Sequence, residues 1–276
     1  MAVCAEQVQA HAHALATALG LNDYNSYARA ALAASLDTTR AVEGMLRRIN
    51  TEFGKPGADA ILTTFCAHHL HKLFAAYKAT HDDRPVTCYT TVIASVMDKG
   101  VFVRFTRTPQ GRELFRIQLR RFAGRGLPRL VDDIRNMAHL FNFFAVHAFY
   151  DQNMTGPCIE SAERHALLMK ADAYRRYCFD QMQKMQDPSA KATFAILTET
   201  VDFLKGVQSP AKMLGAFGAT MPLHVCGDID SQCFSTGVRA TLHCTNCESV
   251  RYCGPVHQRS HWVAEHRSQC VRPVWL

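Results

Sequence analysis

Cysteine and histidine residues gather near the C-terminus at spacings that suit metal binding. Six of the eleven cysteines fall between Cys226 and Cys270, where histidines are interleaved with them. They form four pairs along the chain: Cys226 and Cys233, Cys244 and Cys247, Cys253 and His257, and His266 and Cys270. Four pairs supply the ligands of two tetrahedral sites, and Zn²⁺ takes four sulfur and nitrogen ligands in closed structural sites.

The spacing within the pairs explains how two side chains reach one ion. A Cys-x2-Cys turn, as at Cys244 and Cys247, places two thiolates on one metal. Residues four apart converge on one helix face, so His266 and Cys270 can bind together from a segment of helical character. So short a module buries too little apolar surface for a stable core, and the metal would supply roughly 10–16 kcal/mol of folding free energy. The alternative, free thiols on a disordered tail, leaves the paired spacing unexplained.

The same segment resembles the MYND zinc finger. Its matching residues are Cys244-x2-Cys247-x5-Cys253, with Tyr252 before the last cysteine, then Gln258-x2-His261-Trp262, His266 and Cys270. The related HIT-type finger shares the Tyr-Cys and His-x3-Cys elements but lacks the Gln and Trp positions. The resemblance covers about the last fifty residues and nothing upstream.

The resemblance implies two interleaved structural zinc ions, each held by alternate ligand pairs. The first site would comprise Cys226, Cys233, Cys253 and His257, and the second Cys244, Cys247, His266 and Cys270. Gln258 and Trp262 match positions that bind short, proline-containing peptides, while Trp262 could equally anchor the small core of the module. His261 would bind no metal.

The sequence departs from the family pattern at three places. The first cysteine pair is wider than Cys-x2-Cys, which leaves His224 as a competitor of Cys226. His257 stands where the family has cysteine, which keeps a donor but changes the net charge of the site. Three residues separate Trp262 from His266, one more than usual.

The finger would follow a larger helical domain. Apolar residues at helical spacing predict helices over residues 5–21, 35–53, 57–79, 130–148, 160–185 and 190–207, and stacked helical hairpins would fit this pattern. Residues 86–97 are ambiguous, and residues 100–108 alternate as a short strand would. Residues rich in Gly, Pro and small side chains predict a linker over 207–222. The expected fold is therefore mainly α, with a helical domain at 1–206 and a zinc-stabilised finger at 223–276.

Two upstream features suggest further binding sites. The chain carries a net charge of +7, and arginines recur at Arg104, Arg107, Arg112, Arg116, Arg120, Arg121, Arg125 and Arg129. They would form either a patch for RNA or an acidic partner, or a solvated helix face. His68 and His71 lie close enough to share a metal, but surface or core histidines are the commoner outcome.

The remaining patterns narrow the class of protein. There is no P-loop, dinucleotide fingerprint, HExxH or GxSxG motif, so we expect no enzyme. The N-terminus lacks the features of a signal peptide, and the most apolar stretch, residues 137–150, is too short to span a membrane. The uneven cysteines indicate a reducing, intracellular location, cytoplasmic or nuclear.

We therefore predict a non-enzymatic adaptor whose MYND-like finger binds protein segments. One alternative is a relative of protein lysine methyltransferases, in which such fingers accompany a SET domain, although no Asn-His-Ser-Cys stretch is present. The other is an RNA-associated helical scaffold that uses the stretch Arg104–Arg129.

Overall fold

The computed structural model describes residues 4–22, 36–79, 87–123, 134–135, 138, 161–185, 188–206, 226–228 and 240–275. The fold is mainly α-helical, as predicted. The helices are α1 (Ala5–Ala18), α3 (Leu36–Ala79), α4 (Thr87–Val96), α5 (Gly100–Thr106), α6 (Pro109–Ala123), α8 (Ser161–Met185), α9 (Pro188–Leu204), α12 (Pro255–His261), η1 (Trp262–His266) and α13 (Arg267–Gln269). Strands β1 (Leu242–His243) and β2 (Arg251–Tyr252) form an antiparallel pair.

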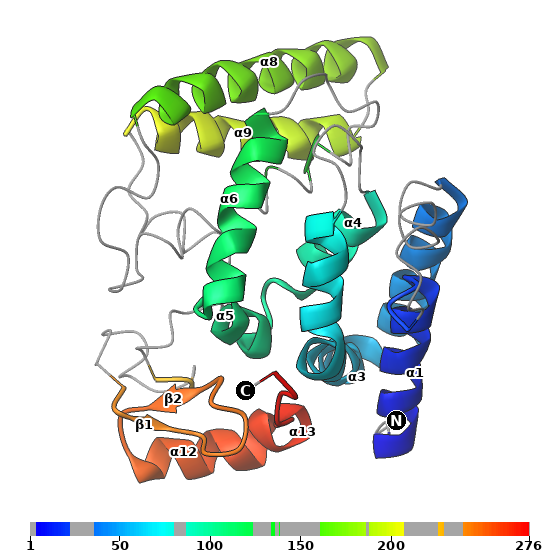
Figure 1. The fold of residues 1–276 in the computed structure, drawn as a ribbon, viewed down its shortest axis with the longest axis vertical. Coiled ribbons are helices and arrows are strands. Elements are labelled where there is room, and N and C mark those ends of the chain that lie inside the picture. Colours follow the sequence, from blue (N-terminus) through cyan, green and yellow to red (C-terminus); the bar gives the residue numbers. More distant parts are fainter. Residues whose placement is uncertain are drawn as a thin grey trace.

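Helices α1, α4, α5 and α6 pack against α3, and the C-terminal module lies at one end of the molecule (Figure 1). Helices α8 and α9 lie side by side at the opposite end, and α6 runs from them toward α5. The strands β1 and β2, with α12 and α13, form a small unit next to α5 and α3. The finger is therefore seated on the helical domain rather than held away from it.

The long helix α3 consists of two helices that meet at Gly54. Gly54 has φ 60° and ψ 179°, a conformation that interrupts the helix and that glycine adopts without a Cβ penalty. Pro56 follows in the first turn of the second helix, where its missing N–H costs no hydrogen bond. The two predicted helices over 35–53 and 57–79 are confirmed with their boundary.

The second half of α3 supplies the centre of the hydrophobic core. Ile61, Phe65, Leu70 and Phe74, which lie roughly on one face of this helix, are all buried. Leu15 of α1 packs into the same core. Burying one side chain of this size contributes about 1.5–3 kcal/mol, so each residue of this face stabilises the domain measurably.

The strand expected over residues 100–108 is wrong, because this segment forms helix α5. Helix α5 has no exposed face, because its buried residues include Val101, Phe102, Val103 and Phe105. Its sequence therefore lacks the alternation of apolar and polar residues every three to four positions that marks an amphipathic helix. Gly111 makes the packing possible, since a Cβ at this position would overlap the carbonyl oxygen of Phe105. The ambiguous residues 86–97 also form a helix, α4.

The other predicted elements divide between confirmed and undescribed parts of the chain. The helices expected over 160–185 and 190–207 correspond to α8 and α9, the latter starting at Pro188. The predicted helix over 130–148 lies outside the described residues except at Ile134, Arg135 and Ala138, and the predicted linker over 207–222 lies wholly outside them. Within the described ranges, no helix has the length and hydropathy that a membrane span requires.

Candidate metal centre

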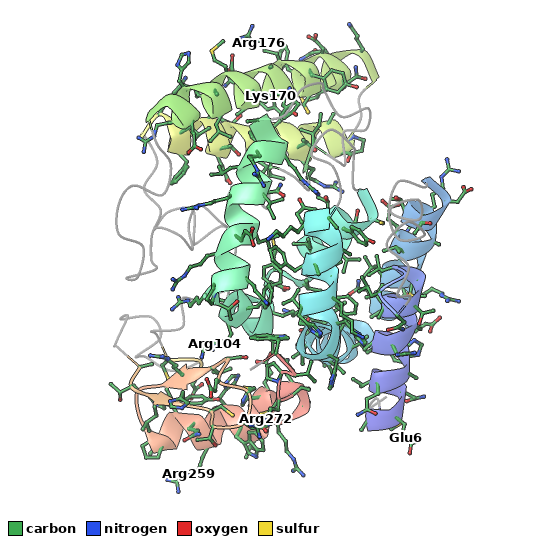
Figure 2. All side chains as sticks on the ribbon, in the orientation of Figure 1. Glu6, Arg104, Lys170, Arg176, Arg259 and Arg272 are labelled. Carbon is green, nitrogen blue, oxygen red and sulfur yellow. The ribbon has the colours of Figure 1, made fainter. Side chains whose placement is uncertain are left out.

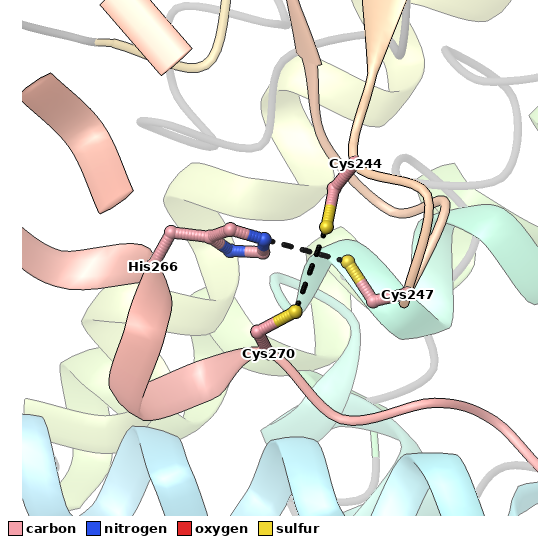
Figure 3. A group of neighbouring side chains, drawn as sticks. All are labelled: Cys244, Cys247, His266 and Cys270. Atoms are coloured by element: carbon pink, nitrogen blue, oxygen red, sulfur yellow. Dashed lines mark hydrogen bonds between the residues drawn. The ribbon is translucent and has the colours of Figure 1, made fainter. Parts of the chain in front are cut away.

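Four potential ligands meet between the β1–β2 turn and the C-terminal helical segment. Cys244, Cys247, His266 and Cys270 place one ligand atom each within 4.8 Å of the others. Figure 3 shows the three sulfur atoms and the imidazole pointing toward a common centre. Cys247 and His266 are nearly inaccessible to solvent. The structure thus brings together the four residues expected for the second site.

The separations within this second cluster, Cys244, Cys247, His266 and Cys270, match the edges of a zinc tetrahedron. Cys244 Sγ lies 3.5 Å from Cys270 Sγ, and Cys247 Sγ lies 3.5 Å from His266 Nε2. Tetrahedral Zn²⁺ with bonds of about 2.3 Å to sulfur and 2.0–2.1 Å to nitrogen sets ligand atoms about 3.6–3.8 Å apart. A disulfide would need about 2.05 Å. The donor set and its spacing therefore fit a zinc ion.

A tight turn presents the two cysteines of the Cys-x2-Cys pair. The N–H of Cys244 donates to the carbonyl of Val250 at 3.0 Å, and the N–H of Glu248 donates to the carbonyl of Cys244 at 2.9 Å. Glu248 adopts φ 53°, a left-handed conformation that is uncommon for residues other than glycine. The turn therefore reverses the chain directly after Cys247 and returns it as β2.

A π-helical turn delivers His266 to this cluster. In η1, the N–H of Arg267 donates to the carbonyl of Trp262, five residues back. A π-helical turn holds one residue more than an α-helical turn, and such turns recur at functional sites. The extra residue between Trp262 and His266 is accommodated here, in the turn itself. His266 consequently faces Cys247, although the spacing differs from that of the family.

A first cluster consists of Cys226, Cys253 and His257. These three residues also place their ligand atoms within 4.8 Å of one another. His257 Nδ1 lies 3.0 Å from Cys253 Sγ and 3.8 Å from Cys226 Sγ. Cys233, the fourth expected ligand, and His224, the possible competitor of Cys226, lie outside the described residues. The structure therefore shows His257 among the cysteines of the first site.

Gly227 holds the Cys226 segment against β2. Its N–H donates to the carbonyl of Arg251 at 2.7 Å. A Cβ at this position would overlap the side chain of Val250, so only glycine permits the approach. This hydrogen bond sets Cys226 beside Cys253. In the sequence, the only hint of the close approach is that a glycine directly follows Cys226.

Electrostatics of the second cluster favour a bound cation. Burial raises the pKa of the Cys247 thiol, and the neighbouring Cys270 and Cys244 raise it further. Burial, assisted by His261, lowers the pKa of His266 to about 4, which keeps its imidazole neutral at pH 7. A neutral imidazole is the form that binds metal, and a divalent ion would offset the cost of gathering buried thiolates.

Polar groups around the ligands complete the centre. The Ser249 N–H lies 3.4 Å from Cys247 Sγ, and the Asn246 side-chain amide lies 3.3 Å from Cys270 Sγ. Donors of this kind orient and stabilise metal-bound thiolates. Sequence reasoning missed both residues, because their roles depend on the turn geometry rather than on a spacing.

The buried Tyr252 contacts the half-buried His261. Tyr252 is fully buried, and its hydroxyl lies 3.2 Å from His261 Nδ1. His261 belongs to neither cluster among the described residues. His261, which was expected to bind no metal, contacts the tyrosine at the core of the finger instead.

The two residues expected to contact peptide differ in exposure. Gln258 is half-buried, whereas Trp262 is 40% exposed. Trp262 contacts His266 edge-on at a ring-centroid distance of 5.7 Å but does not belong to the buried core of the finger. The alternative role of Trp262 as core anchor is wrong, because Tyr252 occupies that position.

The arginine-rich stretch has mixed surroundings. Arg104 pairs with Glu248 at 2.9 Å, and the buried Arg121 donates to the carbonyl of Tyr77 and stacks over its ring. Arg116 and Arg120 are exposed on α6, while Arg125 and Arg129 lie outside the described residues. Figure 2 shows Arg104 directed toward the finger. Part of the stretch therefore serves internal packing rather than an outer basic patch.

The histidines of α3 line a hollow between α1 and α3. His13, His68, His69 and His71 surround a space of about 800 Å³. Among the described residues, however, the groups of three or more metal-binding side chains are the two clusters of the finger. A metal shared by His68 and His71 therefore gains no third ligand here.

Comparison with known proteins agrees with the geometry of the C-terminal module. The family model of the MYND finger matches residues 224–270, and no family model matches the upstream helices. No curated protein and no solved structure matches the chain. MYND fingers bind zinc, mediate protein–protein interactions and are not catalytic. The chain therefore carries a MYND finger at residues 224–270, joined to a helical domain that no comparison identifies.

Proposed function

We propose that the protein is a non-enzymatic adaptor whose MYND finger holds two structural zinc ions and binds short, proline-containing segments of partner proteins. The ligands of the first ion are Cys226, Cys233, Cys253 and His257, and those of the second are Cys244, Cys247, His266 and Cys270. Gln258 and Trp262 contact the peptide. Because thiolate ligands must stay reduced, the adaptor works in an intracellular compartment, cytoplasmic or nuclear.

The metals are structural in this proposal because each ligand set is closed. Four protein ligands leave no open position at Zn²⁺ for a substrate or an activated water. The ligands also make up much of the buried core of the finger, which comprises Cys226, Cys244, Cys247 and Tyr252. Zinc then holds the scaffold on which α12 presents its outer face.

The observation that carries the binding role is a set of exposed apolar side chains near the clusters. Val256 is 65% exposed, Trp262 40% and Val263 83%, on consecutive helices of one module. Tryptophan is enriched in binding hot spots, and exposed apolar side chains on the same helical segment as the polar Gln258 suit a peptide that offers both proline rings and backbone carbonyls.

The test uses an array of proline-containing peptides and the full-length chain. Trp262→Ala and Gln258→Ala should each abolish or weaken binding at least tenfold. Phe179→Ala removes an aromatic side chain that is 44% exposed on α8, and it should leave binding unchanged. The proposal fails if no peptide binds, or if Trp262→Ala binds as the wild type does.

The two alternative functions make separate predictions. A methyltransferase relative would bind S-adenosylmethionine, and tight binding would overturn the adaptor proposal. An RNA scaffold would bind RNA with an affinity that falls steeply with salt and is lost when Arg112, Arg116 and Arg120 are neutralised. The internal contacts of Arg104 and Arg121 do not favour this second alternative.

A further inference from the structure

We propose that metal at the second cluster fastens the finger to the helical domain, so that Cys244, Cys247, His266 and Cys270 act as a clasp between two parts of the chain. This inference rests on the proposed zinc binding at that cluster. It assigns the finger a second binding surface, formed by residues other than Gln258 and Trp262, and the partner of this surface is the protein's own helical domain.

The first contact segment directly follows the ligand Cys247. Glu248 forms an ion pair with Arg104 of α5 at 2.9 Å. Next to it, the carbonyl oxygen of Ser249 lies 3.1 Å from where a Cβ of Gly100 would stand, so glycine at the start of α5 allows the close approach. The same Ser249 directs its N–H toward Cys247 Sγ. The turn that presents a ligand is therefore also the turn that touches the helical domain.

The second contact segment directly follows the ligand Cys270. The N–H of Val274 donates to the carbonyl of Ala67 at 3.0 Å, and Trp275 Nε1 donates to the carbonyl of Cys66 at 3.1 Å. The Trp275 ring meets Phe105 edge-on, with centroids 5.2 Å apart and planes at 75°. Val271 and Trp275 pack against the core of the helical domain rather than that of the finger.

Both contact segments are positioned by the ligands that precede them. Besides Tyr252, the buried core of the finger consists of ligand candidates, so without metal little packing inside the finger would hold the turn and the start of the tail in place relative to each other. Asn246 and Cys270 join the two segments, since the Asn246 side chain donates toward both the carbonyl and the sulfur of Cys270. Releasing the ion therefore frees the turn and the tail together.

The experiment follows the tail when each zinc site is removed in the full-length chain. Cys244→Ser disrupts the second site without touching either contact segment, and Cys253→Ser is the matched control in the first site. Bound zinc is measured in each variant, and hydrogen exchange is followed over residues 271–275. We expect Cys244→Ser to speed exchange of the Val274 amide at least tenfold, because the opening of a docked segment governs its protection. Cys253→Ser should leave it protected.

A second readout uses the two tryptophans of the chain. In a Trp262→Phe background, Trp275 is the sole tryptophan. Its fluorescence should shift to longer wavelength when a chelator removes zinc and return when zinc is restored. Far-UV circular dichroism checks that the helical domain stays folded throughout.

The possible outcomes separate this inference from the proposed function. If the wild type binds no zinc, the proposed function fails and the clasp fails with it. If zinc binds but the tail stays protected after its removal, the clasp is overturned while the zinc proposal stands. Equal loss of protection in Cys244→Ser and Cys253→Ser would overturn the assignment to the second cluster.

Thermodynamic reciprocity gives an independent check. If zinc promotes docking of the tail, docking must raise zinc affinity by the same factor. Trp275→Ala removes a hydrogen bond and an aromatic contact and should weaken zinc binding about tenfold or more. Phe179→Ala, which removes an exposed aromatic side chain of α8 outside the finger, is the control and should leave zinc affinity unchanged. Unchanged affinity in Trp275→Ala would overturn the clasp.

Discussion

Changing the length of the π-helical turn tests how the chain aims His266. All residues from Trp262 to Glu265 are exposed, so deletion of Ala264 removes no core packing. The deletion should convert the turn to a regular α-helical one and keep the flanking residues in register. Insertion of an alanine after Ala264 should instead shift the residues that follow out of register, because the π-helical turn η1 already holds one extra residue.

The expected magnitude follows from helix geometry. One added residue turns the following side chains by about 100° and moves their Cα atoms by about 3.8 Å. Zinc sites tolerate ligand distances within only about 0.2 Å. His266 and Cys270 would both leave the second cluster, so the insertion should reduce bound zinc from two ions to one.

Elemental analysis of the purified variants, with thermal denaturation followed by circular dichroism, provides the assay. We expect two zinc ions after the deletion and one after the insertion, with a lower melting temperature only in the latter. If the insertion keeps two ions, or the deletion loses one, the account of η1 is refuted.

Three further predictions concern the first cluster, the core and pH. Gly227→Ala should lose one zinc ion, measured by elemental analysis, because the added Cβ would overlap Val250. Gly254→Ala is the control: the space around Gly254 is open, so this variant should keep both ions. Phe65→Ala should lower the free energy of unfolding in urea by about 3–5 kcal/mol, because Phe65 is fully buried; a cost under 1 kcal/mol would contradict the packing. Burial, aided by Lys72 and nearby histidines, lowers the pKa of His69 from 6.5 to about 4, so protonation favours the unfolded chain and stability should fall as pH drops between these values. His69→Gln should flatten that slope, measured by urea denaturation across pH, and an unchanged slope would count against this role.

Local patterns predicted the elements whose side chains have distinct inner and outer faces. Apolar residues at helical spacing, Phe65 and Phe74 among them, predicted the second half of α3. The predicted break between residues 53 and 57 falls where the structure places Gly54, whose role the sequence did not reveal. Helix α5 escaped this reasoning, because it is covered on all sides and its buried Val and Phe residues look like a strand. Only tertiary packing decides such a segment.

The finger shows the same division between local and long-range information. Ligand pairs follow from short spacings along the chain, and the paired cysteines and histidines were found that way. Asn246 contacts the distant Cys270 and Gly227 the distant Arg251, so their roles follow from the fold rather than from the ligand spacing. Trp275 belonged to the predicted finger, but its ring packs on Phe105 because the docking site exists only after α3 and α5 have folded.

Zinc stoichiometry of the wild type and of His257→Ala tests the central claim most directly. The account predicts two ions per chain in the wild type, because two ligand groups are present, and one ion in His257→Ala, because His257 lies within the first cluster. A wild type with fewer than two ions, or a variant that retains both, would contradict the account.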